Sequence, residues 1–281
     1  MALERRIPLE GSFNCRDLGG YPGDGSRTVR WGRVFRSDAL HALTEKDRRR
    51  LESLGIRRVI DLRSPGEAEK YPDILPAGAV YENINPQASL AQQAGSLRED
   101  DRGKVEKLKG LAETPEGRDF LVNNKNAMAS QMRALVKSPG AIAAYRRFFS
   151  SLAGGGPLIF HCQGGKDRTG LAALLFLLVL GVDRRIARED YLLTREMNRE
   201  RNRRRMDEYR RYTDHPLVLE YLEGLMDTRE EYIDAALEEM DRLSQGASPL
   251  APGGYLRVSL GLGEKEIDTL RALYLEPLPR D

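Results

Sequence analysis

The chain of 281 residues has little of what disulfide-bonded and zinc-dependent proteins need, because it contains only two cysteines and three histidines. Cys15 and Cys162 are too few for the disulfide framework of a small secreted protein. His41, His161 and His215 are scattered along the chain without metal-ligand spacing, which argues against a zinc hydrolase. We therefore expect neither a metal nor another cofactor.

The sequence also lacks a long hydrophobic segment and a strong net charge. Its most apolar stretch, Leu171 to Leu180, is about half the length that spans a bilayer, so it predicts a buried helix. The first residues, MALERRIPLEG, contain no apolar core of a secretory signal. We expect a cytoplasmic protein, with export by a signal-independent route left open. A net charge of +2 gives no general indication of nucleic-acid binding.

Short apolar runs alternate with helical patterns in a way that predicts an α/β fold over a single domain, residues 1–281. Strands are predicted at 33–36, 59–62, 79–84 and 157–161, and helices at 44–54, 141–152, 169–180 and 264–275. The C-terminal half is rich in helix, with a charged helix at 183–212 and one or two helices at 217–243. A short strand or turn is predicted at 255–258. The polar segment at about 87–137 has only patchy helical periodicity and is interpreted as an insertion or a helical lid.

The segment PLIFHCQGGKDRTG (157–170) joins a predicted strand to a predicted helix and suits covalent phosphoryl transfer. A thiol attacks as thiolate, and because a free cysteine titrates at about 8.5, Cys162 needs a site that stabilises the anion. Converging loop amides and a helix N-terminus supply that potential. Gly164 and Gly165 permit the tight turn. Arg168 can then grip two phosphate oxygens at once.

The remaining residues of this loop complete the predicted site. Thr169 is expected to donate its hydroxyl to the thiolate, and His161 to hold the loop through backbone hydrogen bonds. The predicted phosphate-binding residues are Gln163, Gly164, Gly165, Lys166 and Thr169. A Walker-type loop would need Ser or Thr where Asp167 follows Gly-Lys, and rhodanese-like sulfurtransferases use a shorter loop. A buried structural cysteine at this turn explains less of the pattern.

The sequence HCQGGKDRTG resembles the signature HCxxGKDRTG of bacterial tyrosine and lipid phosphatases. Other blocks are also similar to family segments: GSFNCRDLGGY, WGRVFRSDALHALTEKD, LGIRRVIDLRSPGE, GVDRRIAREDYLLTREMN and YLRVSLGLGEKEIDTLRALYLE. The resemblance covers nearly the whole chain except about Gln87 to Lys137. It implies a central, mostly parallel sheet flanked by helices, and phosphorylated proteins or phosphoinositides as substrates. Cys15 replaces the family's usual aromatic residue, and is interpreted as an apolar filler or, alternatively, a redox partner of Cys162.

Two aspartates compete for the role of general acid. Asp167 lies inside the loop, and the similar loop of myotubularin-type phosphatases uses that aspartate, which favours it. Asp61 ends a predicted strand, where α/β sheets present functional groups, and remains an alternative. Asp61 could instead form an ion pair or a cap that orders the loop near Arg63. Lys166 would suit a substrate with several phosphates. Arg16 is expected near the pocket rim, and Arg63, like Arg36, either contacts substrate or forms a structural ion pair.

Two further functions compete with an enzyme. One is a catalytically silent phosphate-binding module, although such a module need not keep the nucleophile. The other is an interaction protein built on the long C-terminal helices. Eight arginines lie between Arg195 and Arg211. They are interpreted as a solvated helical face paired with nearby acids, with weak attraction to an anionic membrane surface as the alternative.

Overall fold

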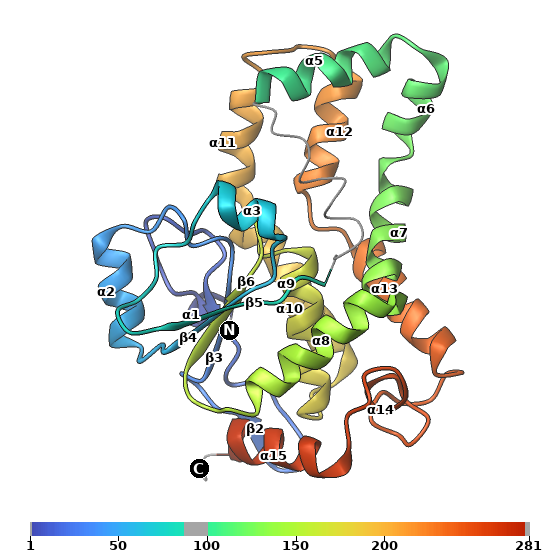
Figure 1. Cartoon of the computed structure of the whole chain (residues 1–281). Helices are drawn as coiled ribbons and strands as arrows, with labels where there is room; N and C mark the ends of the chain where they lie inside the picture. Colours follow the sequence, from blue (N-terminus) through green and yellow to red (C-terminus); the bar gives the residue numbers. More distant parts are fainter. Residues whose placement is uncertain (1, 87–100, 279–281) are drawn as a thin grey trace.

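The computed structural model describes residues 2–86 and 101–278, and its centre is a five-stranded sheet in the order β1-β3-β6-β4-β5 (Figure 1). The strands are β1 (Arg16–Asp17), β3 (Val34–Ser37), β6 (Leu158–His161), β4 (Arg58–Asp61) and β5 (Val80–Asn83). Only β1 pairs antiparallel with its neighbour, and the other pairings are parallel. The predicted α/β class with a mostly parallel central sheet is confirmed.

Alternate residues of the strands point to opposite faces of the sheet and fill two hydrophobic clusters. Ile159 of β6 lies in a cluster with Leu51 of helix α2 (Glu45–Ser53). Leu158 and Phe160 face the other way, toward α8 (Pro139–Leu152) and α9 (Asp167–Val179). From Thr169 onward every residue of α9 is buried, as the apolar run predicted. Within the described residues, no helix is long and apolar enough to cross a membrane.

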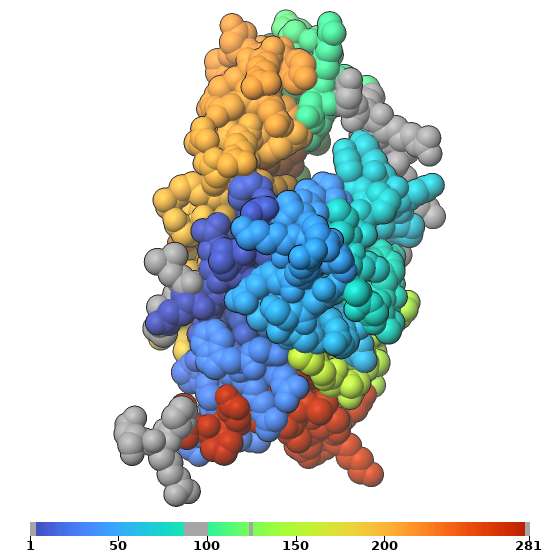
Figure 2. Space-filling model, turned by 90° about the vertical axis from the view of Figure 1, so that its left-hand side faces the viewer, coloured from blue at the N-terminus to red at the C-terminus, as the bar shows by residue number. Residues whose placement is uncertain are grey.

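A helical unit stands above the sheet and has its own hydrophobic cluster (Figure 1). Its helices are α5 (Asp101–Ala112), α6 (Pro115–Val122), α7 (Asn124–Lys137), α11 (Arg199–Tyr209) and α12 (Pro216–Met226). The cluster is formed by α5, α6, α11 and α12, whereas buried residues of α7 such as Met132 join the larger cluster with α8 and α9. Figure 2 shows α11 and α12 at one end of the molecule and α15 (Glu264–Tyr274) at the other. The segment predicted as an insertion is therefore helical over 101–137, while its residues 87–100 lie outside the described residues. The sequence did not predict that it packs with 199–226.

Several predicted elements have different boundaries in the structure. The helix expected at 183–212 is interrupted at Asn198, which separates α10 (Arg184–Met197) from α11. The pattern at 217–243 forms two helices, α12 and α13 (Glu230–Leu243). The prediction of a strand or turn at 255–258 is wrong for the strand, because α14 (Tyr255–Val258) buries Tyr255, whose hydroxyl donates to the carbonyl of Val136. The remaining elements are α1 (Ala2–Arg5), α3 (Pro65–Lys70), and the antiparallel pair β2 (Arg27–Val29) and β7 (Leu275–Pro277).

Candidate active site

The loop between β6 and α9 lies at the carboxyl end of the parallel strands, where α/β sheets bind ligands. It borders a pocket of about 170 Å³. The structure brings together six of the predicted site residues there: Cys162, Gln163, Gly164, Lys166, Asp167 and Arg168. The helical unit adds Gln131 from α7, Arg201 from α11, and Leu225 and Met226 from α12. The sequence did not predict these four, because their positions follow from how the helices pack.

Three side chains hold the carbonyl groups of the loop. Gly165 O accepts hydrogen bonds from Asn14 Nδ2 at 2.9 Å and from Arg36 Nη2 at 2.8 Å, and Gly164 O accepts one from Asn198 Nδ2 at 3.0 Å. The C=O and N–H of a peptide unit point in opposite directions, so these bonds leave the following amides free to turn toward the pocket. Sequence reasoning missed Asn14 and Asn198, and Arg36 makes the structural contacts that were one of its two expected alternatives.

Two glycines of the loop segment have a clear steric requirement. Gly165 has φ +62°, and a Cβ there would lie 2.4 Å from Ser37 O. A Cβ on Gly170 would lie 2.5 Å from the ring of Tyr191, so this glycine allows α10 to approach α9 closely. Gly164 has neither a positive φ nor a backbone obstacle. Of the predicted glycine pair, therefore, only Gly165 is needed for the turn.

Arg168 is held by a two-pronged ion pair with Glu67 of α3. Its Nη1 and Nη2 lie 2.7 Å and 2.9 Å from the two carboxylate oxygens, and Nη1 also donates to Leu62 O. Burial alone would raise the pKa of Glu67, but the hydrogen bonds and charge of Arg168 outweigh it and lower that pKa. The guanidinium is thus fixed in orientation at the pocket wall. Glu67 was not predicted, although it lies in the segment SPGE that carries part of the family resemblance.

Lys166 and Asp167 both line the pocket, but their contacts differ. Lys166 Nζ donates to Leu225 O at 2.7 Å and to Asp227 O at 2.9 Å, so it links the loop to the end of α12. Asp167 opens α9 and accepts a hydrogen bond from Tyr191 Oη at 3.4 Å. Burial, and then the charge of Asp167, raise the pKa of Tyr191, which keeps the phenol protonated as a donor.

Thr169 and His161 lie behind the pocket wall. The Thr169 hydroxyl is buried and has no hydrogen-bond partner in the described part of the chain, so it is available as a donor to a neighbouring group. His161 Nδ1 donates to Cys162 O at 3.2 Å, which agrees with a role in supporting the loop.

Asp61 and Arg63 belong to a buried ion-pair network rather than to the pocket. The Arg63 guanidinium lies 2.8 Å from Asp61 and 2.7 Å from Asp73, and Tyr81 Oη donates to Asp61 at 2.8 Å. Burial would raise the pKa of Asp61, but hydrogen bonds from Arg63 and the nearby charges lower it. Both side chains are fully enclosed, which matches the ion-pair alternatives expected for Asp61 and Arg63. It does not match the expectations that Asp61 acts as an acid at the pocket or that Arg63 contacts substrate.

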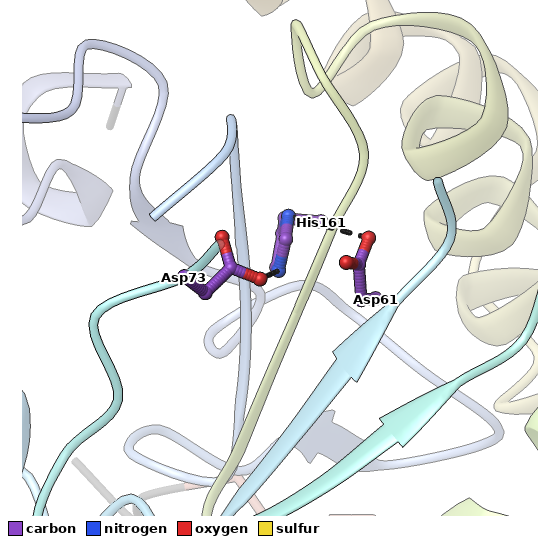
Figure 3. A group of neighbouring side chains, drawn as sticks. All are labelled: Asp61, Asp73 and His161. Carbon is purple, nitrogen blue, oxygen red and sulfur yellow. Dashed lines mark ion pairs between the residues drawn. The ribbon is translucent and has the colours of Figure 1, made fainter. Parts of the chain in front are cut away.

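Figure 3 shows His161 between the carboxylates of Asp61 and Asp73, with Nε2 at 3.0 Å from Asp73 Oδ2. These three side chains are close enough to one another to hold a metal ion, a grouping that their sequence spacing did not predict. The Arg63 guanidinium already binds both carboxylates, and its positive charge explains why two buried aspartates can lie so close together.

Arg16 is also fully buried and does not approach the pocket rim. Its Nε lies 3.2 Å from Asp190 Oδ1, while Arg36 Nη1 lies 2.5 Å from Asp190 Oδ2. Burial would raise the pKa of Asp190, but the two guanidinium groups lower it to about 2. Asp190 was not predicted. Asp190 holds Arg36, and Arg36 in turn donates to Gly165 O, so Asp190 supports the loop indirectly.

Cys15 packs in the cluster of Phe35 and Ile159, whereas Cys162 belongs to the larger cluster on α8 and α9. Burial, followed by the charge of Asp38, raises the pKa of the Cys15 thiol to about 12. This thiol therefore stays protonated, which favours the interpretation as an apolar filler.

Comparisons with known proteins agree with this architecture. The model of the tyrosine phosphatase family matches residues 7–276. The chain is 32% identical over 263 residues to a Cupriavidus necator protein whose name places it among tyrosine-protein phosphatases, covering 93% of this chain and 85% of that one. It is 29% identical over 285 residues to the triple specificity protein phosphatase PtpB of Mycobacterium tuberculosis, covering 95% and 98%. A tyrosine-protein phosphatase of Nostoc commune is 29% identical over 150 residues, which is 52% of this chain and 43% of that one.

The fold and these matches define the class of protein: it is a phosphatase, a hydrolase of phosphate esters. Because the family model covers nearly the whole chain, the protein belongs to the tyrosine phosphatase family.

Proposed function

We propose that the protein hydrolyses phosphate monoesters through a phosphocysteine intermediate on Cys162. The observation that carries this proposal is the shared pocket of Cys162, Asp167 and Arg168 at the N-terminus of α9. The helix terminus and the guanidinium favour negative charge there, both on a thiolate and on a bound phosphate.

The reaction proceeds in two steps. The thiolate of Cys162 attacks phosphorus, the bond to the leaving oxygen breaks, and Asp167 donates a proton to that oxygen. Water then attacks phosphorus, Asp167 takes its proton, and the sulfur–phosphorus bond breaks to restore the thiolate. Arg168 and the amides of Gln163 to Lys166 bind the equatorial oxygens, and the Thr169 hydroxyl donates to the departing sulfur.

Asp167 is the better candidate for the general acid because it lines the pocket, whereas Asp61 is enclosed and held by Arg63. Asp167→Asn should lower kcat/KM for phosphotyrosine about 100-fold, and less for aryl phosphates whose leaving group needs no proton. A series of aryl phosphates of graded leaving-group pKa measures this. Asp61→Asn is the matched control and should lower stability without changing the dependence on the leaving group. An equal loss for all leaving groups in Asp167→Asn would contradict the assignment.

We further propose that residues 1–281 form one phosphatase domain in which the helical unit acts as a lid. Side chains from α7, α11 and α12 wall the pocket, and Lys166 bonds to the end of α12. The lid thus combines 101–137 with 199–226, two segments separated by the catalytic loop in the sequence.

The proposed substrates are phosphotyrosine and phosphoserine or phosphothreonine in proteins, and phosphoinositides. The support is the match to PtpB, which is named a triple specificity protein phosphatase and is covered over 98% of its length. Phosphate release from a phosphotyrosine peptide, a phosphothreonine peptide and several phosphoinositides, in EDTA and reductant, tests the proposal. We expect metal-independent turnover of all three classes. Binding of orthovanadate without any turnover would identify a silent phosphate-binding module instead.

A further inference from the structure

Arg201 lies at the pocket without belonging to the catalytic loop. It is on α11, and its Nη1 and Nη2 lie 3.5 Å and 3.6 Å from the position a Cβ on Gly164 would occupy. The guanidinium therefore rests against the loop, two residues beyond Cys162, and both side chains line the same pocket.

Arg201 also differs from the other arginines of its helix. Arg199 pairs with Glu196, Arg203 and Arg204 pair with Glu200, and Arg205 pairs with Asp101 and Glu208. In the described part of the chain, no carboxylate lies within ion-pair distance of Arg201. Its contact is Asn202 Oδ1, a neutral oxygen at 3.3 Å from Nη1. A positive charge without a counter-charge thus faces the pocket.

The other two basic residues of the pocket wall already have strong partners. Arg168 is bound by Glu67, and Lys166 donates to two carbonyl groups at the end of α12. Arg201 is therefore the lining cation that remains available to a second anionic group. Its planar guanidinium suits two oxygens of a phosphate.

We propose that Arg201 binds a second phosphate carried by the same ring as the scissile phosphate, as in the headgroup of a phosphoinositide with two or more phosphates. This rests on the proposed function of the pocket. Cys162 and Arg201 line the same pocket of about 170 Å³, which favours two anions carried close together on one small group. The ring of phosphotyrosine carries a single phosphate and offers Arg201 no partner. Arg201 therefore sets the preference between the two substrate classes.

Binding tests this without depending on turnover. In a Cys162→Ser background, titration calorimetry with soluble inositol polyphosphates should show an affinity about 10- to 100-fold weaker when Arg201→Gln is added. The matched control is Arg199→Gln, the same change on the same helix at an arginine paired with Glu196, and it should keep the affinity. Equal affinities in all three proteins would overturn the proposal. So would an equal loss with phenyl phosphate, because Arg201 would then act on the reacting phosphate.

Turnover provides the second measurement. With Cys162 intact, Arg201→Gln should lower the ratio of kcat/KM for a bisphosphorylated phosphoinositide to that for a phosphotyrosine peptide by about 10- to 100-fold. Absence of turnover in the unchanged protein would reject the proposed function, while the calorimetry would still decide on Arg201. A loss of turnover on phosphoinositide vesicles without a loss of affinity for soluble inositol phosphates would show that Arg201 binds the membrane surface. That result would overturn the ring-phosphate assignment.

Discussion

Cys162→Ser should reduce phosphate release by about 10⁴-fold or more on every substrate, while binding of a phosphotyrosine peptide persists. A serine hydroxyl stays protonated near neutral pH, so the potential at the α9 N-terminus has no thiolate to stabilise. The loop amides and Arg168 remain, and they are the groups that hold the phosphate. Steady-state phosphate release and calorimetric binding measure the two effects separately.

The second cysteine provides the matched control. Cys15→Ser makes the same atomic change at a thiol that is buried, protonated and outside the pocket, so kcat should stay close to that of the unchanged protein. A comparable loss in both variants would mean that the substitutions act through folding. Turnover that survives in Cys162→Ser would require a different nucleophile and would reject the phosphocysteine mechanism.

The part of the site that the sequence predicts is the part that is local in the chain. A strand, a glycine turn and a helix N-terminus follow each other within residues 157–170, so Cys162, Asp167 and Arg168 could be placed relative to one another from spacing alone. Hydrophobic patterning likewise predicts the buried helix α9, because its apolar residues leave no polar face.

The part that sequence reasoning misses depends on contacts between distant segments. Glu67 meets Arg168 across 101 residues, and Asn14 meets Gly165 across 151. Nothing in the spacing of these residues indicates such pairs. Asp61 is a different case, because its partner Arg63 is only two residues away and their ion pair could be considered from the sequence. Asp61 does end a strand at the functional edge, but whether its carboxylate faces the pocket or Arg63 depends on tertiary packing.

These distant contacts share a function, since each fixes one part of the phosphate cradle. Glu67 orients the guanidinium of Arg168, and Asn14 and Asn198 hold loop carbonyls. Arg36 also holds a loop carbonyl, but it is a buried cation and needs a counter-charge of its own. Asp190 supplies that charge, and it is shared with Arg16.

Asp190→Asn should therefore be among the most destabilising substitutions in the protein. It leaves two fully buried guanidinium groups without a counter-charge. Breaking a buried ion pair in this way lowers the free energy of unfolding by about 3–5 kcal/mol, and the whole free energy of unfolding of a typical protein is about 5–15 kcal/mol. Urea unfolding at pH 7 measures the loss. Glu189→Gln removes the neighbouring carboxylate on the same helix, which forms an exposed pair with Arg185, and should cost a small fraction of this. Equal urea concentrations at the unfolding midpoint of the two variants would contradict the role given to Asp190.

The effect of Asp190→Asn on the free energy of unfolding should also depend on pH, and that dependence identifies the ionised carboxylate of Asp190 as the cause. The pKa of Asp190 is about 2 in the folded protein and about 3.9 for an ordinary aspartate in the unfolded chain. A lowered folded pKa means that the stabilisation is complete above about pH 4 and is lost as the pH falls toward 2. The difference in unfolding free energy between the unchanged protein and Asp190→Asn should therefore be constant from pH 7 to about 5 and shrink below 4. A difference that does not change with pH would point to lost packing, because packing does not depend on the charge that Arg16 and Arg36 require.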